Sequence, residues 1–336
     1  MRRTRTALAT LTTLSVCLML GACGGDKKED DSSAPASDAP TSEAAEPQTW
    51  PLTGLPVKDG EAAKDHPVYV LKMDNTANSA PQQGLGSADL VVEELVEGGA
   101  TRLAAFYYSK IPGDVGPVRS MRASDIGIVT PADATVVTSG AAAPTIARLK
   151  KADISWVTEG SEGFFREDSR SAPYNLFANL QDVAKAAKEK AVRPEDYLPF
   201  GSADDLPKGQ KATSITAAFS AGHTTEWTYR DGTYVNDNSF AAEGDQFPAD
   251  TILVLRVKVG DAGYVDPAGN PVPETKFEGS GEAMLFHGGR LVRGTWTKDA
   301  LESTITLSTK EGDLTVPAGH TWIELVPQDG GDVTFK

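Results

Sequence analysis

Four acidic side chains crowd nine consecutive positions in the first third of the chain: Asp89, Glu93, Glu94 and Glu97, with Arg102 just beyond a Gly-Gly pair. Asp89, Glu93 and Glu97 stand four residues apart, so they share one face of either a helix or a strand. Acids at this spacing form either a solvated surface with one weak ion pair or one wall of a site. The spacing alone leaves both interpretations open.

The surrounding residues favour a pair of strands over a helix. Two strand-like runs flank Gly98-Gly99, which is typical of a two-residue hairpin loop. In that register Arg102 lies diagonally between Glu93 and Glu97, within reach of both. The opposite face is apolar except for Glu94, so we expect it to meet the core.

General acid–base catalysis is one chemistry that these acids suggest. Paired carboxylates hydrolyse glycosidic bonds when they flank the bond at short range. Glu93 and Glu97 on one strand would stand roughly 13 Å apart, so a catalytic pair needs an acid from another segment, such as Asp74. An envelope-polymer hydrolase using Glu93 or Glu97 with Asp74 is therefore one hypothesis.

Other catalytic and metal-binding patterns are missing from the sequence. The segment TSGAAAP lacks the G-x-S-x-G pattern of a serine-hydrolase elbow. The histidines lie far apart without ligand-like neighbours, which argues against zinc; they are His66, His223, His287 and His320. We expect no metal and no cofactor, and the absence of a nucleophile, a metal cluster or a close acid pair favours a protein that is not an enzyme.

The elements that position these residues read as mixed α/β in the first half. PVYVLKMDN (67–75) predicts a buried strand, and 135–139, 144–151 and 154–158 read as strand, helix and strand, which implies a parallel strand pair. A second helix is expected over 179–191, with Asn179 as its cap. The sequence thus predicts an α+β or mixed α/β fold with a mixed sheet in its N-terminal domain.

The second half is β-rich. Asp231-Gly232 and Gly288-Gly289 are hairpin signals between strand-like runs. Prolines cluster near 200–212, where we place a domain boundary. The predicted organisation is a signal peptide (1–22), a lipidated cysteine with an acidic disordered linker (23–49), an N-terminal α/β domain (50–205) and a smaller β-rich C-terminal domain (206–336).

The N-terminus predicts secretion and a lipid anchor. A basic start, a moderately apolar stretch and LGAC ending at Cys23 match a signal peptide followed by a lipobox. In this interpretation Cys23 carries the lipid, palmitate included, and becomes the first mature residue. The other cysteine, Cys17, lies inside the signal, so the mature chain has no disulfide. We expect an extracytoplasmic protein anchored to the outer face of the bacterial cell membrane.

Charge excludes one class of partner. The net charge is −15, and loss of the three signal arginines brings the mature chain to −18. Nucleic acid should repel such a chain. The expected partners are the cytoplasmic membrane, through the anchor, and a cell-wall component or envelope protein.

Several motifs, taken together, resemble those of the YerB-like lipoproteins, a bacterial family grouped under a domain of unknown function (3048). They are PLTGLPV, MDN followed by PQQGL, ADLVVEELVEGGATR, GPVRSMR and FFREDSRSAPYNLF, with GTW and PAGHTWIELVP near the C-terminus. The resemblance implies a lipid-anchored protein with an α/β N-terminal domain and a β-rich C-terminal one. This chain departs from the family's pattern at Ser139 to Ala141, where histidine and glycine are usual, and at Tyr174.

The family-like polar residues include five arginines in a strongly acidic protein. Guanidinium groups match carboxylate or phosphate with a fixed fork of donors. Their concentration suggests an anion pocket, or else an internal network that pins loops together. The candidate ligand-binding residues are Asp74, Asn75, Asp89, Glu93, Glu97, Arg102, Arg119, Arg122, Arg166, Arg170 and Asn175, and Gln82 and Ser120 also match the family.

The hypothesis favoured by these observations is a non-catalytic accessory or binding protein of the cell envelope, with an arginine-rich pocket in its N-terminal domain. The helix N-terminus expected after Ser139 to Ala141 would add backbone N–H donors for an anion. The hydrolase is the first alternative, and a structural member of an envelope complex is the second.

Overall fold

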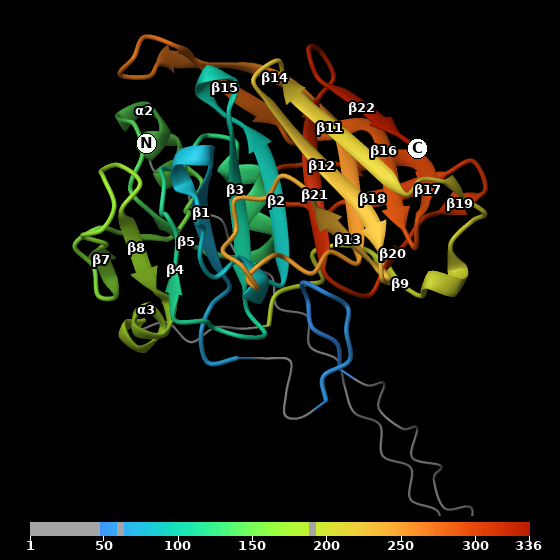
Figure 1. Ribbon diagram of the computed structural model, residues 1–336, viewed down its shortest axis with the longest axis horizontal. Coiled ribbons are helices and arrows are strands. Elements are labelled where there is room, and N and C mark those ends of the chain that lie inside the picture. Colours follow the sequence, from blue (N-terminus) through green and yellow to red (C-terminus); the bar gives the residue numbers. More distant parts are fainter. Residues whose placement is uncertain (1–47, 59–63, 188–192) are drawn as a thin grey trace, which may run out of the picture. The chain divides into compact units, whose positions relative to one another are not determined.

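The computed structural model describes residues 48–58, 64–187 and 193–336, which lie within one compact unit, Glu46–Lys336. A mixed sheet of 13 strands dominates this unit (Figure 1). Its strands follow the order β19 (Gly312–Asp313), β18 (Thr306–Thr309), β17 (Arg290–Lys298), β16 (Gly279–His287), β14 (Thr251–Val265), β21 (Thr321–Pro327), β2 (Leu90–Leu95), β3 (Thr101–Tyr107), β1 (Tyr69–Asn75), β5 (Thr135–Thr138) and β6 (Trp156–Thr158), with β10 (Gln210–Lys211) paired to β17 and β15 (Pro271–Lys276) to β14.

Smaller sheets and short helices complete the described residues. The sheets are β13 (Thr233–Asn236), β12 (His223–Arg230), β11 (Ser214–Ser220) and β22 (Asp332–Phe335); β4 (Asp114–Val115), β8 (Leu176–Asn179) and β7 (Phe164–Arg166); and β20 (Val316–Pro317) with β9 (Phe200–Gly201). The α-helices are α1 (Asp125–Val129), α2 (Ala143–Lys151) and α3 (Leu180–Ala186), and the 3-10 turns are η1 (Ala77–Ser79), η2 (Leu85–Ser87), η3 (Glu97–Gly99), η4 (Thr130–Ala132) and η5 (Ala203–Asp205). Within the described ranges, none of the helices has the length and apolarity to cross a membrane.

The central strands of the large sheet are buried on both faces, which explains their nearly continuous hydrophobic sequence. One face packs against α1 and α2, as shown by the cluster that joins Val92 to Ile128 and Leu149. The other face packs against the four-stranded sheet and α3, where Val91 shares a cluster with Trp227 and Val183. Any charged side chain on these strands is therefore a core residue and needs a partner.

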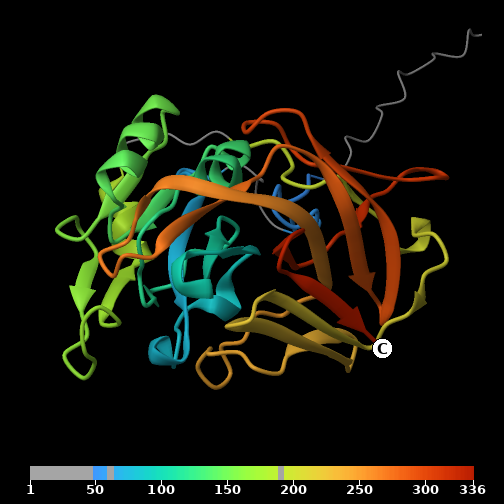
Figure 2. The same cartoon turned by 90° about the horizontal axis from the view of Figure 1, so that it is seen from above.

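One sheet runs through both halves of the chain. β21 lies between β14 and β2 and is parallel to both. The fold is thus mixed α/β as expected, but strands dominate it and the C-terminal half contributes to the central sheet beside the N-terminal half. Figure 2 shows the hairpin of β14 and β15 reaching across to α2, where Glu274 pairs with Arg148 through two hydrogen bonds. The domain boundary at 205/206 stays a prediction.

Several local predictions are confirmed. β5, α2 and β6 form the β-α-β unit, and β5 pairs with β6 in parallel. The Asn179 side chain caps α3 by accepting a hydrogen bond from the Asp182 backbone N–H at 3.1 Å, although the helix ends at Ala186 and part of the predicted range lies outside the described residues. The hairpins at 231–232 and 288–289 both have the expected two-residue loops.

The predicted register of the acidic hairpin is wrong by one residue. Leu95 pairs with Thr101 and Glu94 with Arg102, because the loop is a three-residue turn, η3, in which Gly98 and Gly99 have φ of 71° and 74°. Two successive left-handed residues are readily accommodated by glycine. Since a shift of one residue reverses the face of each side chain relative to its partner strand, Arg102 lies on the face opposite Glu93.

Candidate functional site

Three arginines and two acids lie together at the strand ends of the sheet, where β1 ends and β3 begins. We call Arg102, Arg119, Arg122, Asp74 and Glu97 the arginine cluster. The Arg122 guanidinium donates two hydrogen bonds to the Glu97 carboxylate, one of them from Nε to Oε2 at 2.8 Å. Arg102 donates a further hydrogen bond to Glu97 at 3.2 Å. Arg119 Nε lies 2.9 Å from Asp74 Oδ2. The cluster therefore has one more positive than negative side chain.

Arg102 and Arg122 have few donors left for a ligand. Arg102 also donates to the Ser120 carbonyl oxygen, and Arg122 to that of Met121, both at 2.8 Å. Burial, and then the neighbouring charge of Arg122, lower the pKa of Arg102 to about 10. Burial alone would raise the pKa of Glu97, but the bond from Arg122 and the charges of both arginines hold it below its usual value. These three side chains form an internal ionic strut.

Arg119 is the exception in the cluster. Its side chain is 21% exposed, and its Nε faces Asp74. Its guanidinium group lies over the Tyr174 ring, 5.4 Å from the centroid. Among the described residues, its two terminal nitrogens make no hydrogen bond. These nitrogens form a donor fork at the surface, the kind of group that binds carboxylate or phosphate.

The turn between β5 and α2 lies beside Arg119. The Ser139 N–H donates to the Arg119 carbonyl oxygen at 3.1 Å, and the Met121 N–H donates to that of Gly140 at 2.9 Å. The hydroxyl oxygens of Ser120 and Ser139 are 3.2 Å apart. The first turn of α2 has no side-chain cap. The turn that sequence analysis associated with anions thus adjoins the arginine cluster.

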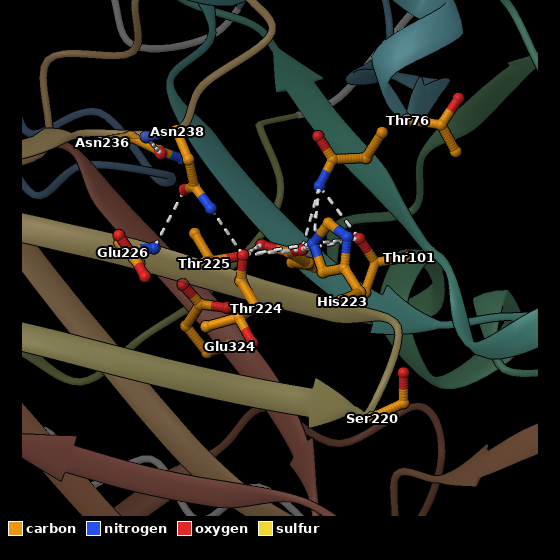
Figure 3. Close-up of polar contacts among 12 residues, drawn as sticks. Thr76, Thr101, Ser220, His223, Thr224, Thr225, Glu226, Asn236, Asn238 and Glu324 are labelled. Atoms are coloured by element: carbon orange, nitrogen blue, oxygen red, sulfur yellow. Dashed lines mark hydrogen bonds and ion pairs between the residues drawn. The ribbon is translucent and has the colours of Figure 1, made fainter.

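A second polar cluster lies on the opposite face of the same strands. Figure 3 shows its members His223, Thr225, Thr101 and Glu324. We call Glu93, Glu324, His223, Thr225 and their neighbours Asn75 and Thr101 the acid–histidine cluster. Glu93 and Glu324 are fully buried and pair directly across the parallel strands β2 and β21. His223 Nε2 lies 2.9 Å from Glu93 Oε1, and the Thr225 hydroxyl donates to Glu93 Oε2 at 3.0 Å.

A buried lysine accounts for Glu94, the residue that seemed out of place on the apolar face. Lys72 Nζ lies 2.8 Å from Glu94 and 2.6 Å from Asp125, and all three side chains are fully buried. Burial by itself would lower the pKa of Lys72, but the two carboxylates raise it. The ammonium group is therefore charged and shared between the two acids.

The remaining predicted residues lie apart from both clusters. Asp89 stands at the other end of β2 and accepts the Tyr108 and Ser109 N–H groups. Arg166 pairs with exposed Glu159 and with Asn175, and Arg170 donates to two backbone carbonyl oxygens. Within the described ranges no contact joins Arg166 or Arg170 to the arginine cluster, so three of the five arginines lie together and a pocket lined by all five stays a prediction.

Glu93 and Asp74 were proposed as a catalytic pair. They point to opposite faces of the sheet, because successive side chains along a strand alternate between the faces. That pairing is wrong. Sequence analysis also missed Glu324 and His223 as site residues. Glu324 had a usable signal, since a lone acid inside the apolar run TWIELV needs a partner. His223 had none, because its contact with Glu93 spans 130 positions.

Comparison with known proteins agrees with this architecture. Two family models match the chain: "Protein of unknown function (DUF3048) N-terminal domain" over residues 52–193 and the corresponding C-terminal domain over 215–323. The Bacillus subtilis (strain 168) protein named "Putative lipoprotein YerB" is 26% identical over 292 residues, which cover 82% of this chain and 86% of that protein. A crystal structure of the YerB protein from Bacillus subtilis shares the fold, with a TM-score of 0.70 at 23% identity over 85% of this chain and 99% of that one. The chain belongs to the YerB-like family of proteins of unknown function, defined by the paired DUF3048 domains.

Proposed function

We propose that this chain is a lipid-anchored extracytoplasmic protein of the cell envelope that binds an anionic ligand at the arginine cluster without catalysing a reaction. The anchor rests on the lipobox at Cys23, which lies outside the described residues, and on the name of the Bacillus subtilis relative, which calls that protein a lipoprotein. The ligand site rests on the geometry around Arg119.

The observation that carries the proposal is the contrast among the three arginines. Arg102 and Arg122 are buried and bonded to Glu97 and to backbone carbonyl oxygens. Arg119 is the partly exposed member, and in the described part of the chain its contacts are the Asp74 carboxylate, on Nε, and the Tyr174 ring. A guanidinium held over a tyrosine ring and against a carboxylate is fixed in direction, so little conformational entropy opposes ligand binding.

Carboxylate or phosphate is the ligand chemistry that fits this fork. The surplus positive charge of the cluster stands in a chain of net charge −15, so the local field is opposite to that of the whole molecule. Cell-wall peptides carry carboxylates and wall polymers carry phosphates. A ligand from either class suits both the chemistry and the expected location.

Catalysis finds less support in the same geometry. Glu97 is held as a carboxylate by two arginines, which suits a strut better than a proton donor. Glu93 is fully buried on the opposite face from Asp74. A hydrolase using Glu97 with Asp74, and a purely structural role in an envelope complex, remain the alternative proposals.

Thermal melting of the full chain in mild detergent tests the ligand site. The wild type, Arg119→Ala and Arg293→Ala would be melted with muropeptides, phosphorylated sugars, nucleotides and inorganic phosphate. Arg293 is the matched control because it makes a half-exposed ion pair with Glu282. Binding to the native state raises the melting temperature, so we expect a ligand to shift the wild type and Arg293→Ala but not Arg119→Ala. Equal shifts in all three, or none with any compound, would refute the site.

A further inference from the structure

The carboxyl group of Glu93 is surrounded by hydrogen-bond donors. The Thr101 hydroxyl donates at 2.6 Å and the Asn75 amide at 2.9 Å to Oε1. Oε2 receives the Thr225 hydroxyl at 3.0 Å and the Trp322 indole N–H at 3.3 Å. With His223 Nε2 also at 2.9 Å, these groups match a carboxylate that accepts at every lone pair. Of the pair Glu93 and Glu324, Glu93 is therefore the ionised member.

Glu324 has the opposite surroundings. Among the described residues, its Oε1 accepts one bond, from the Trp227 indole N–H at 2.8 Å, and its buried Oε2 accepts none. Glu324 is the direct cross-strand neighbour of Glu93, and both side chains are fully buried. Two ionised carboxylates cannot bond to one another, and no cation contacts Glu324 in the described part of the chain. A proton on Glu324 resolves both problems, because the neutral acid donates to Glu93.

We propose that Glu93, Glu324 and His223 form a proton-binding site, in which Glu324 is kept as a neutral acid beside the Glu93 carboxylate and His223 is kept as an imidazolium. The site then has no net charge although it holds three titratable groups. It joins β12 of the four-stranded sheet to β2 and β21 of the large sheet. The bound protons hold the two sheets together at this point.

The groups that face this site support the assignment. Asn75, Thr101 and Thr225 are neutral, and the Phe219 ring packs edge-on against the imidazole of His223 at 6.0 Å. Among the described residues, the charged or titratable groups that face His223 are Glu93 and, behind it, Glu324. Within the ranges that the structure describes, no arginine or lysine contacts the site to replace the protons.

The pKa shifts agree with the geometry. Burial, and then the charge of Glu93, raise the pKa of Glu324 well above its usual value. Burial opposes charge on His223, but its bond with Glu93 and the charge of Glu93 raise its pKa overall. Both groups thus bind protons more tightly in the folded chain than in the unfolded one. The stability that these two protons contribute is fully present below the unfolded pKa values and is lost as the pH rises through the folded ones.

Infrared spectroscopy of the full chain in mild detergent tests for the proton on Glu324. We expect the carbonyl band of a protonated carboxylic acid at pH 7 in the wild type. The difference spectrum between wild type and Glu324→Gln should contain this band, whereas that between wild type and Glu226→Gln should not, because Glu226 is an exposed acid on β12. A wild-type spectrum without the band at pH 7, or a Glu324→Gln difference spectrum without it, would overturn the proposal.

Denaturant unfolding from pH 6 to pH 9 tests the part played by His223. Each proton held only by the folded state lowers the folding equilibrium constant by up to about tenfold per pH unit as the pH rises. We expect His223→Gln to be less sensitive to pH than the wild type, and the control His66→Gln to match the wild type. If the profiles of wild type and His223→Gln run parallel, His223 does not carry a proton of the site.

Discussion

The arginine cluster and the acid–histidine cluster lie on opposite faces of β1, β2 and β3, yet they solve the problem of buried charge differently. On one face, a permanent cation contacts each carboxylate: Lys72 lies between Glu94 and Asp125, and arginines pair with Glu97 and Asp74. On the other face, Glu93 and Glu324 lie together with one histidine, and no lysine or arginine of the described residues contacts them. The first solution relies on side-chain cations, whereas the second relies on protons from solution.

The difference follows from strand alternation. Adjacent residues Glu93 and Glu94 point to opposite faces, and each meets whatever the covering layer supplies. α1 supplies Asp125, which shares Lys72 with Glu94. The four-stranded sheet supplies His223 and Thr225 to Glu93. The adjacent residues Glu93 and Glu94 therefore belong to two separate polar clusters, one on each face of the sheet.

The largest expected effect is on the face with permanent cations. Lys72→Ala leaves Glu94 and Asp125 buried without their counter-charge, which should cost about 3–5 kcal/mol of unfolding free energy. Urea unfolding would measure the loss, and Lys185→Ala, which breaks an exposed pair with Asp182, should leave stability unchanged. A loss below about 1 kcal/mol would show that the triad contributes no more than a surface pair.

The second prediction separates the two acids of the acid–histidine cluster. Glu93→Gln removes the charge that several donors share and should cost about 2–3 kcal/mol at pH 7. Glu324→Gln should cost less than about 1 kcal/mol, because an amide resembles a neutral acid and its NH₂ group can donate to Glu93. Chemical denaturation at pH 7 measures both values. Equal losses would contradict the assignment of the proton to Glu324.

These asymmetries show where sequence analysis succeeds and where it stops. Local signals located β1, the β-α-β unit and the hairpin at Gly288-Gly289, because turn residues and periodicity act over a few positions. The predicted register of the acidic hairpin was wrong by one residue, because Glu97 lies in the turn η3 and not in the strand. This shift of one residue places Arg102 on the face of the sheet opposite Glu93.

Partners from distant segments could not be read from spacing. The family motifs grouped Arg102, Arg119 and Arg122 with Arg166 and Arg170 as one candidate set. Nothing in the sequence distinguished the last two, which contact other loops. The contact between Glu93 and His223 depends on how the four-stranded sheet covers β2. That packing is a tertiary property without a local signal.

A third prediction uses pH to sharpen the contrast. Glu97 has a lowered pKa, so its stabilisation is present above the unfolded pKa and is lost as the pH falls through the folded value. Glu97→Gln should cost about 1–2 kcal/mol at pH 7 and should flatten the acid side of the stability profile. His223→Gln should flatten the alkaline side instead. If both variants altered the same side, the clusters would not be independent proton-linked centres.

The smallest expected effect on folding distinguishes a ligand-binding residue from a strut. Arg119→Ala should cost about 1 kcal/mol of unfolding free energy. Asp74 is buried, but it still accepts the Thr76 N–H at 3.0 Å and the Thr76 hydroxyl, and the charge of Arg102 remains close to it. Arg122→Ala should cost more, about 1–3 kcal/mol, since it removes the two-pronged partner of Glu97.

Comparing these two variants by urea unfolding, and then by ligand-induced melting shifts, separates the two roles inside one cluster. A residue kept for binding should lose ligand response with little loss of stability, and a strut should do the reverse. If Arg119→Ala unfolds as readily as Arg122→Ala, Arg119 is also a strut. The cluster would then be an internal brace at the end of β1, and a ligand would have to be sought elsewhere on the protein.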